Sequence, residues 1–208
     1  MVEAEILAFE ILTLAAANFG TTTLAAQSIL STCLSIAFQF PFPLAIAASS
    51  RIANLIGCGA TPAARTAAKV STVAALGVGA LNLSVLLGFR TLIPRLFTHD
   101  AAVVTLVANV IPICASFQLL DALAVTLNGI LRGLGRQVVG GYAQMFCYYG
   151  IAMPVSMGTA FGLGWSLWGM WMGVAMGLAA VCVIEGVYVL RYDWEKAAQV
   201  AKERNALP

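Results

Sequence analysis

Acidic side chains inside long apolar segments are the residues of this sequence most able to do chemistry. Asp121 is the clearest case, because its neighbours are Phe, Gln, Leu and Ala and no Lys or Arg lies within four residues of it. An ionised carboxylate at the centre of a bilayer costs about 2.5–3.5 kcal/mol on insertion scales, so such an acid usually binds a proton, a cation or a polar partner. We expect Asp121 to bind a proton or a cation in a cavity; the alternative is a structural acid hydrogen-bonded to a neighbouring helix.

Two further acids, Glu5 and Glu10, lie in the first apolar segment. They are five residues apart, which separates them by about 140° around a helix, so they face different directions. Glu10 lies deeper and is the better candidate for a buried binding group. Glu5 is expected to support it, with a solvated helix end as the alternative.

Other polar residues in the apolar segments are weaker candidates. Gln27, Gln118, Tyr148 and Tyr149 could contact an organic ligand, although interhelical hydrogen bonding or packing explains each of them equally well. Glu185 lies near the end of the last apolar segment, where we expect it to snorkel into water and to carry no function.

The composition is that of a membrane protein. Of the 208 residues, 61% are hydrophobic and only 10% are charged, whereas soluble domains have about 25% charged residues. The net charge is only +2, and the sequence has no basic stripe of the kind that binds nucleic acid. The five cysteines are scattered and odd in number, which argues against a disulfide framework or a metal site.

The apolar residues form six segments, each long enough to cross a bilayer or nearly so. They run approximately over residues 4–19, 24–48, 70–89, 101–131, 138–161 and 165–190. Helices are expected, because only helices or closed barrels satisfy the backbone in lipid and no strand-like alternation is present. The prediction is an all-α, multi-pass bundle of six transmembrane helices over residues 1–190, with a polar tail at 191–208. The longest loop is expected at 49–69, and the tail either forms a short amphipathic helix or frays.

The distribution of basic residues predicts the orientation. With six spans, nine Lys and Arg residues fall in the loops 49–69 and 132–137 and in the tail, whereas Arg90 and Arg95 fall on the opposite side. Because basic loops stay in the cytoplasm, both termini are expected there.

No enzyme motif accompanies these segments. The single histidine, His99, lies in a loop, and there is no Walker, GxSxG or HExxH motif. We therefore expect neither an enzyme nor a bound cofactor, and any transport has to run downhill or on an ion gradient.

Several local patterns resemble eukaryotic multidrug and toxic compound extrusion (MATE) transporters, in the order of their seventh to twelfth helices. They are the acid-x4-acid of 5–10, AQS at 26–28, AASSRIANLIG at 47–57, the acid Asp121, GILRGLGRQ at 129–137, YY at 148–149 followed by Pro154, and the W-x-KA tail beginning at Trp194. The resemblance covers nearly the whole chain but only the second half of such a transporter. Two positions depart from it, because some members have an acid where Thr32 stands and many have Glu where Asp121 stands.

The resemblance implies one lobe of an antiporter that exports organic, often cationic, drugs or metabolites in exchange for H⁺ or Na⁺. It implies Glu10 and Asp121 as the coupling or substrate carboxylates. The partners are the lipid bilayer, a small organic substrate, and a missing N-terminal six-helix lobe or a second chain. Either the plasma membrane or the vacuolar membrane is expected to contain the protein.

The main alternative is a non-transporting half-bundle that pairs with or regulates a full-length transporter. It predicts no uptake by the chain alone and a dependence on a partner.

Overall fold

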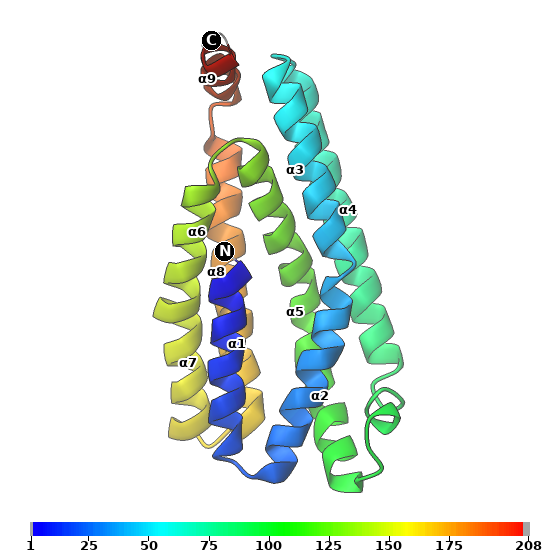
Figure 1. Ribbon diagram of the computed structural model, residues 1–208. Coiled ribbons are helices and arrows are strands. Elements are labelled where there is room, and N and C mark those ends of the chain that lie inside the picture. Colours follow the sequence, from blue (N-terminus) through cyan, green and yellow to red (C-terminus); the bar gives the residue numbers. More distant parts are fainter. Residues whose placement is uncertain (1, 206–208) are drawn as a thin grey trace.

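The computed structural model describes the backbone of residues 2–205 and the side chains of residues 7–203. Within this part of the chain, every regular element is helical (Figure 1). The α-helices are α1 (Val2–Ala17), α2 (Thr21–Phe38), α3 (Pro41–Gly57), α4 (Thr61–Gly88), α5 (Ala101–Gly133), α6 (Gln137–Met145), α7 (Met153–Met157), α8 (Ser166–Arg191) and α9 (Trp194–Asn205). A short 3₁₀ helix, η1 (Pro94–Leu96), precedes α5, and two π-helical segments, η2 (Phe146–Ala152) and η3 (Gly158–Gly162), flank α7.

The predicted all-α membrane bundle is confirmed. Four helical stretches of the described residues have the length and hydropathy to cross a membrane: 21–57, 61–88, 101–133 and 166–191. The other two predicted spans are α1, which has a shorter apolar part at 7–17, and the run from α6 to η3, which π-helical turns divide.

The second span is a bent helix made of α2 and α3 (Figure 1). The break falls at Gln39 and Phe40, whose N–H groups donate to the carbonyls three residues back, at 3.1 and 3.3 Å. Pro41 follows as the first residue of α3, where its missing N–H leaves no unsatisfied donor. The bend lies beside Phe38, which lines the cavity described below.

The predicted long loop at 49–69 is wrong. Helix α3 continues to Gly57 and α4 begins at Thr61, so only Cys58, Gly59 and Ala60 form the turn. Gly59 has φ +74°, a left-handed conformation that glycine adopts without strain. Hydropathy marks where a helix leaves the apolar region, but polar residues such as Arg51 are good helix formers, so the helices continue beyond that point.

Helix α5 is the centre of the bundle and packs against α2, α3, α4 and α8. Its contact with α3 is unusually close. A Cβ atom on Gly129 would lie 2.5 Å from the carbonyl oxygen of Ala45, and one on Gly133 would lie 2.8 Å from that of Ser49. Small residues that allow backbones to approach are typical of helix contacts in membranes, where lipid provides little hydrophobic driving force between helices.

The run from α6 to η3 packs along α8. Ser156 Oγ donates to the carbonyl of Met170 at 2.8 Å, and Thr159 Oγ1 donates to that of Gly169 at 2.8 Å. These bonds hold the π-helical region, where the regular backbone pattern changes, against a regular helix.

The tail forms a helix, which is one of the two outcomes expected for it. Trp194, Ala197 and Ala198 of α9 are buried, and the first two pack with Ile52 of α3 and Ala64 of α4. Helix α9 therefore packs against α3 and α4, and it lies at the same end of the bundle as the turn between them (Figure 1).

Candidate substrate and cation site

A cavity of about 650 Å³ lies between α1, α2 and α5. This is within the range of about 300–1,000 Å³ that small-molecule sites occupy. The residues that line it are Phe9, Glu10, Thr13, Leu14, Ser31, Leu34, Ser35, Phe38, Gln39, Phe117, Gln118 and Asp121. The structure thus brings Glu10 of α1 and Asp121 of α5, more than one hundred residues apart in sequence, to one cavity.

The two acids differ in exposure. Asp121 is 6% exposed, whereas Glu10 is exposed on the α1 side of the cavity, so the burial expected for Glu10 is not found in this lobe and its role stays a prediction. Among the described residues that line the cavity, none is Lys or Arg. The walls therefore carry two acidic groups without a basic one, which favours a cationic ligand.

Aromatic rings form much of the remaining wall. Phe9 and Phe117 both line the cavity and both contact Trp171 of α8, with ring centroids 5.7 and 5.6 Å apart. Trp171 is 1% exposed and supports these two rings from behind. Rings of this kind attract organic cations through their π faces.

Gln118 is placed by an amide of α4. Its Oε1 atom accepts a hydrogen bond from Asn82 Nδ2 at 3.2 Å, and Asn82 Nδ2 also donates to the carbonyl of Ala37 at 3.0 Å. The Nε2 atom of Gln118 has no hydrogen-bond partner within the described structure, so it can donate to a ligand in the cavity that Gln118 lines. Gln118 and Asp121 are three residues apart and share a face of α5.

Gln27 lies behind the cavity wall. It is 1% exposed, does not line the cavity, and donates to Ser31 Oγ at 3.3 Å and Thr13 Oγ1 at 3.5 Å. Since Thr13 and Ser31 do line the cavity, the structure places Gln27 where it positions these hydroxyls.

The remaining predicted residues have different locations. Tyr148 is 1% exposed and lines a smaller pocket together with Asp121, whereas Tyr149 is exposed on the surface of the bundle and lines neither space. Glu5 belongs to α1, but its side chain lies outside the described side chains. A role for Tyr149 or Glu5 therefore stays a prediction.

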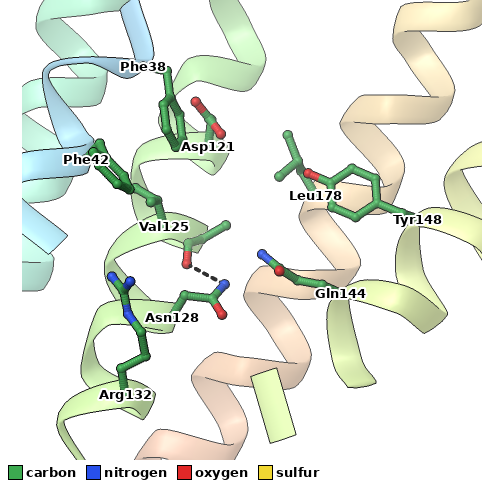
Figure 2. A pocket seen from close by; sticks show the side chains of 10 residues that line it. Phe38, Phe42, Asp121, Val125, Asn128, Arg132, Gln144, Tyr148 and Leu178 are labelled. Carbon is green, nitrogen blue, oxygen red and sulfur yellow. Dashed lines mark hydrogen bonds between the residues drawn. The ribbon is translucent and has the colours of Figure 1, made fainter. Parts of the chain in front are cut away.

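The smaller pocket has a volume of about 40 Å³, enough for at least one water molecule. Asp121 lines it as well as the large cavity. Figure 2 shows Asp121, Asn128 and Arg132 in succession along α5, with Gln144 and Tyr148 facing them across the pocket. Asp121 therefore borders both the large cavity and the smaller pocket.

Sequence reasoning missed the aromatic wall, and although Asn82 was a candidate for a hydrogen bond between helices, its partner was not predicted. Phe117 is four residues before Asp121 and Thr13 is three residues after Glu10, so helical periodicity from each acid would have found them. Asn82 had no such relation, because it is 36 residues from Gln118. Among the described residues, no group of three His, Cys, Asp or Glu side chains could hold a metal ion.

Comparison with known proteins identifies the class. The sequence model of the MatE family matches residues 2–157. The chain is 34% identical over 200 residues to multidrug and toxin extrusion protein 2 of Mus musculus, covering 96% of this chain and 35% of that protein. It is 35% identical over 184 residues to protein DETOXIFICATION 14 of Arabidopsis thaliana, covering 85% of this chain and 37% of that protein.

The fold agrees. The crystal structure of the eukaryotic MATE transporter AtDTX14 superposes with a TM-score of 0.87 at 32% identity, covering 95% of this chain and 44% of that one. The chain therefore belongs to the MATE family of transporters, and its bundle has the fold of one lobe of such a transporter. It spans 30–38% of the length of the curated relatives it matches.

Proposed function

We propose that this chain forms one lobe of a secondary antiporter that exports organic cations in exchange for protons or sodium ions. The single observation that carries the proposal is the shared cavity of Glu10 and Asp121, which has aromatic walls and, among its described lining residues, no basic group.

The coupling follows from competition for these carboxylates. Burial makes a charge on Asp121 costly, Glu10 is exposed in this lobe, and a proton, a sodium ion or a cationic substrate can each neutralise either carboxylate. One carboxylate cannot be neutralised comfortably by two cations together. Binding of the coupling ion therefore releases the substrate on one side of the membrane. On the other side, binding of the substrate releases the coupling ion.

Exchange across the membrane requires movement of two lobes around a central site. In this proposal the second lobe comes from further sequence of the same protein or from another chain. The Lys and Arg asymmetry supports cytoplasmic termini, and in this proposal the α9 end of the bundle lies on the cytoplasmic side.

The first experiment is equilibrium binding of a fluorescent quaternary ammonium probe to the chain in lipid nanodiscs. We expect binding that acid or Na⁺ displaces, and at least a tenfold loss of affinity, about 1.4 kcal/mol, in Glu10→Gln and Asp121→Asn. Glu195→Gln changes an exposed acid of α9 and is the matched control. Displacement by acid but not by Na⁺ assigns the coupling ion as H⁺, and the reverse result assigns Na⁺.

Binding that neither substitution weakens would contradict the proposal. No binding at all, in a chain that is folded by circular dichroism, would favour the non-transporting half-bundle. Counterflow of the same probe in proteoliposomes, with the second lobe present, then tests the exchange itself.

A further inference from the structure

Glu185 of α8 is a fully buried acid that the proposed antiport does not use. It is 0% exposed, and neither carboxylate oxygen has a hydrogen-bond partner within the described structure. The expectation that it snorkels into water is wrong, because it shares the inward face of α8 with Leu178, Cys182 and Val189, all of them buried. A side chain on this face cannot reach the helix end.

The groups around Glu185 come from three elements. Asn128 of α5 faces the carboxylate, Cys147 of η2 lies near it, and Cys182 is near both Glu185 and Asp121. Cys182 Sγ donates to the carbonyl of Leu120 at 3.2 Å, so this thiol is directed away from the carboxylate.

The buried acceptors of the site are short of donors: the Asn128 amide faces Glu185 but completes no hydrogen bond with it in the described structure. Asn128 Nδ2 donates to the carbonyl of Ala124 at 3.2 Å, which fixes the orientation of the amide, because the reversed amide would place two carbonyl oxygens together. Its Oδ1 atom is buried and has no partner, like both oxygens of Glu185. A proton on Glu185 adds the missing donor and removes the buried charge at the same time.

No basic group of the described structure supplies that donor. Arg132 is one turn beyond Asn128 on α5 and is the nearest basic residue to it along the helix. The Nε atom of Arg132 has no hydrogen-bond partner, and neither oxygen of Glu185 accepts a hydrogen bond. Arg132 and Glu185 are therefore not hydrogen-bonded to each other in the described structure. A neutral acid is the state that fits these surroundings.

The small pocket lies between this site and Asp121: Glu185 does not line it, but Asn128, which faces Glu185, does. Asp121 and Asn128 are seven residues apart on α5, about 10.5 Å along the helix axis, and both line the small pocket (Figure 2). Gln144 Oε1, also buried and without a partner, belongs to the opposite wall. Water molecules hydrogen-bonded in a row through this pocket can take up the proton of Glu185 at one end and give one to the carboxylate of Asp121 at the other, each water passing on one proton as it receives another. One O–H bond breaks at Glu185 and one forms at Asp121, and each water of the row ends with two protons as it began.

We propose that Glu185 and Asn128 form a second proton-binding site of the lobe, near its α9 end, which exchanges protons with Asp121 through the small pocket. Protonation of Glu185 itself does not depend on the proposed antiport; only its use for coupling rests on that function. The site takes a proton and not a metal ion, because its ligands are few and its one acid is neutralised by a single charge.

Infrared spectroscopy of the chain in lipid nanodiscs tests the site, since protonated and ionised carboxyl groups absorb at different frequencies. We expect an acid carbonyl band at neutral pH that is lost in Glu185→Gln and kept in the exposed control Glu195→Gln. Gln mimics the protonated acid, so we expect this variant to fold; if it does not, Glu185→Asp is expected to move the band instead of removing it.

Asp121→Asn tests the connection between the two acids. It is expected to keep the Glu185 band but to change the pH at which the band disappears, because the two groups interact. An unchanged spectrum in both Glu185→Gln and Glu185→Asp, or replacement of the band by a carboxylate band when Na⁺ is added, would overturn the site. An unchanged titration in Asp121→Asn would overturn the exchange with Asp121. Neither readout depends on binding of the ammonium probe, so failure of the antiport proposal remains distinguishable.

Discussion

Gln118 accepts a hydrogen bond from Asn82 at 3.2 Å, and this bond fixes an amide of α5 one turn before Asp121. The same Asn82 nitrogen bonds to the carbonyl of Ala37 at the end of α2. One side chain of α4 therefore connects two helices that form the cavity, and it does so next to the bend between α2 and α3. Asn82 does not line the cavity itself, but its hydrogen bond fixes the orientation of Gln118, which does.

Replacing Asn82 by Leu is expected to disturb binding without touching the ligand. The change leaves Gln118 Oε1 buried without a donor, which costs about 1–3 kcal/mol of folding free energy. We expect a lower midpoint of thermal unfolding and weaker binding of the ammonium probe. Ser84→Ala is the control on the same helix, because Ser84 is exposed and bonds only to the carbonyl of Ala80. Equal effects of the two variants would show that Asn82 does not position Gln118.

The close contact between α3 and α5 gives a prediction about packing. Gly129→Ala adds a methyl group that meets the backbone of Ala45 at 2.5 Å, where no flexible side chain can yield. Overpacking of this kind destabilises by about 1–3 kcal/mol. Gly77→Ala, on an exposed face of α4 with nothing within 4 Å, is expected to leave the unfolding midpoint unchanged or to raise it slightly. Chemical denaturation in mild detergent measures both, and equal stability of the two variants would contradict the tight contact.

The sequence alone predicted much of the architecture. Apolar length predicted the helical membrane bundle, and an acid without a basic neighbour pointed to Asp121, which lines the cavity, because in lipid each of these features has few alternatives. The contacts between Asn82 and Gln118, or between Phe117 and Trp171, could not be predicted, since they depend on how helices rotate against one another. The same limit explains Glu185: its distance from the helix end suggested snorkelling, but the direction in which α8 faces decides its burial.

Helix α9 gives a prediction about local stability. Trp194 is 5% exposed and its Nε1 donates to the carbonyl of Val189 at 3.4 Å. Trp194→Ala removes about 3–5 kcal/mol of packing, most of it from the docking of α9 on α3 and α4. We expect faster tryptic cleavage at Lys196 and Lys202, with unfolding of the bundle unchanged. Val200→Ala alters an exposed residue of the same helix and is expected to leave the cleavage rate unchanged.

The contact of Arg136 with Tyr192 connects the turn before α6 to the tail and gives a prediction about pH. Arg136 Nε donates to the Tyr192 hydroxyl at 3.0 Å, and this hydrogen bond raises the pKa of Arg136 above its ordinary value. A base with a raised pKa stabilises the fold at every pH below its unfolded value, and that stability is lost only as pH rises through the folded value. For arginine this range is strongly alkaline, so the difference in stability between Tyr192→Phe and the unchanged chain is expected to be small and constant from pH 5 to pH 8. A difference that varies over this range, measured by thermal unfolding, would assign the dependence to another group.

The aromatic wall yields the sharpest prediction about the ligand. Phe38 lines both the large cavity and the small pocket, and its ring lies 5.5 Å from that of Phe42. A cation near an aromatic face gains about 0.5–2 kcal/mol, so Phe38→Leu is expected to weaken binding of the quaternary ammonium probe by roughly 2- to 30-fold. An uncharged probe of the same shape should lose much less, because Leu retains most of the apolar surface. Phe40→Leu, two residues away and 60% exposed, is the matched control. Equal losses for the charged and uncharged probes would show that Phe38 contributes only apolar contact, and the selectivity for cations would then rest on Glu10 and Asp121 alone.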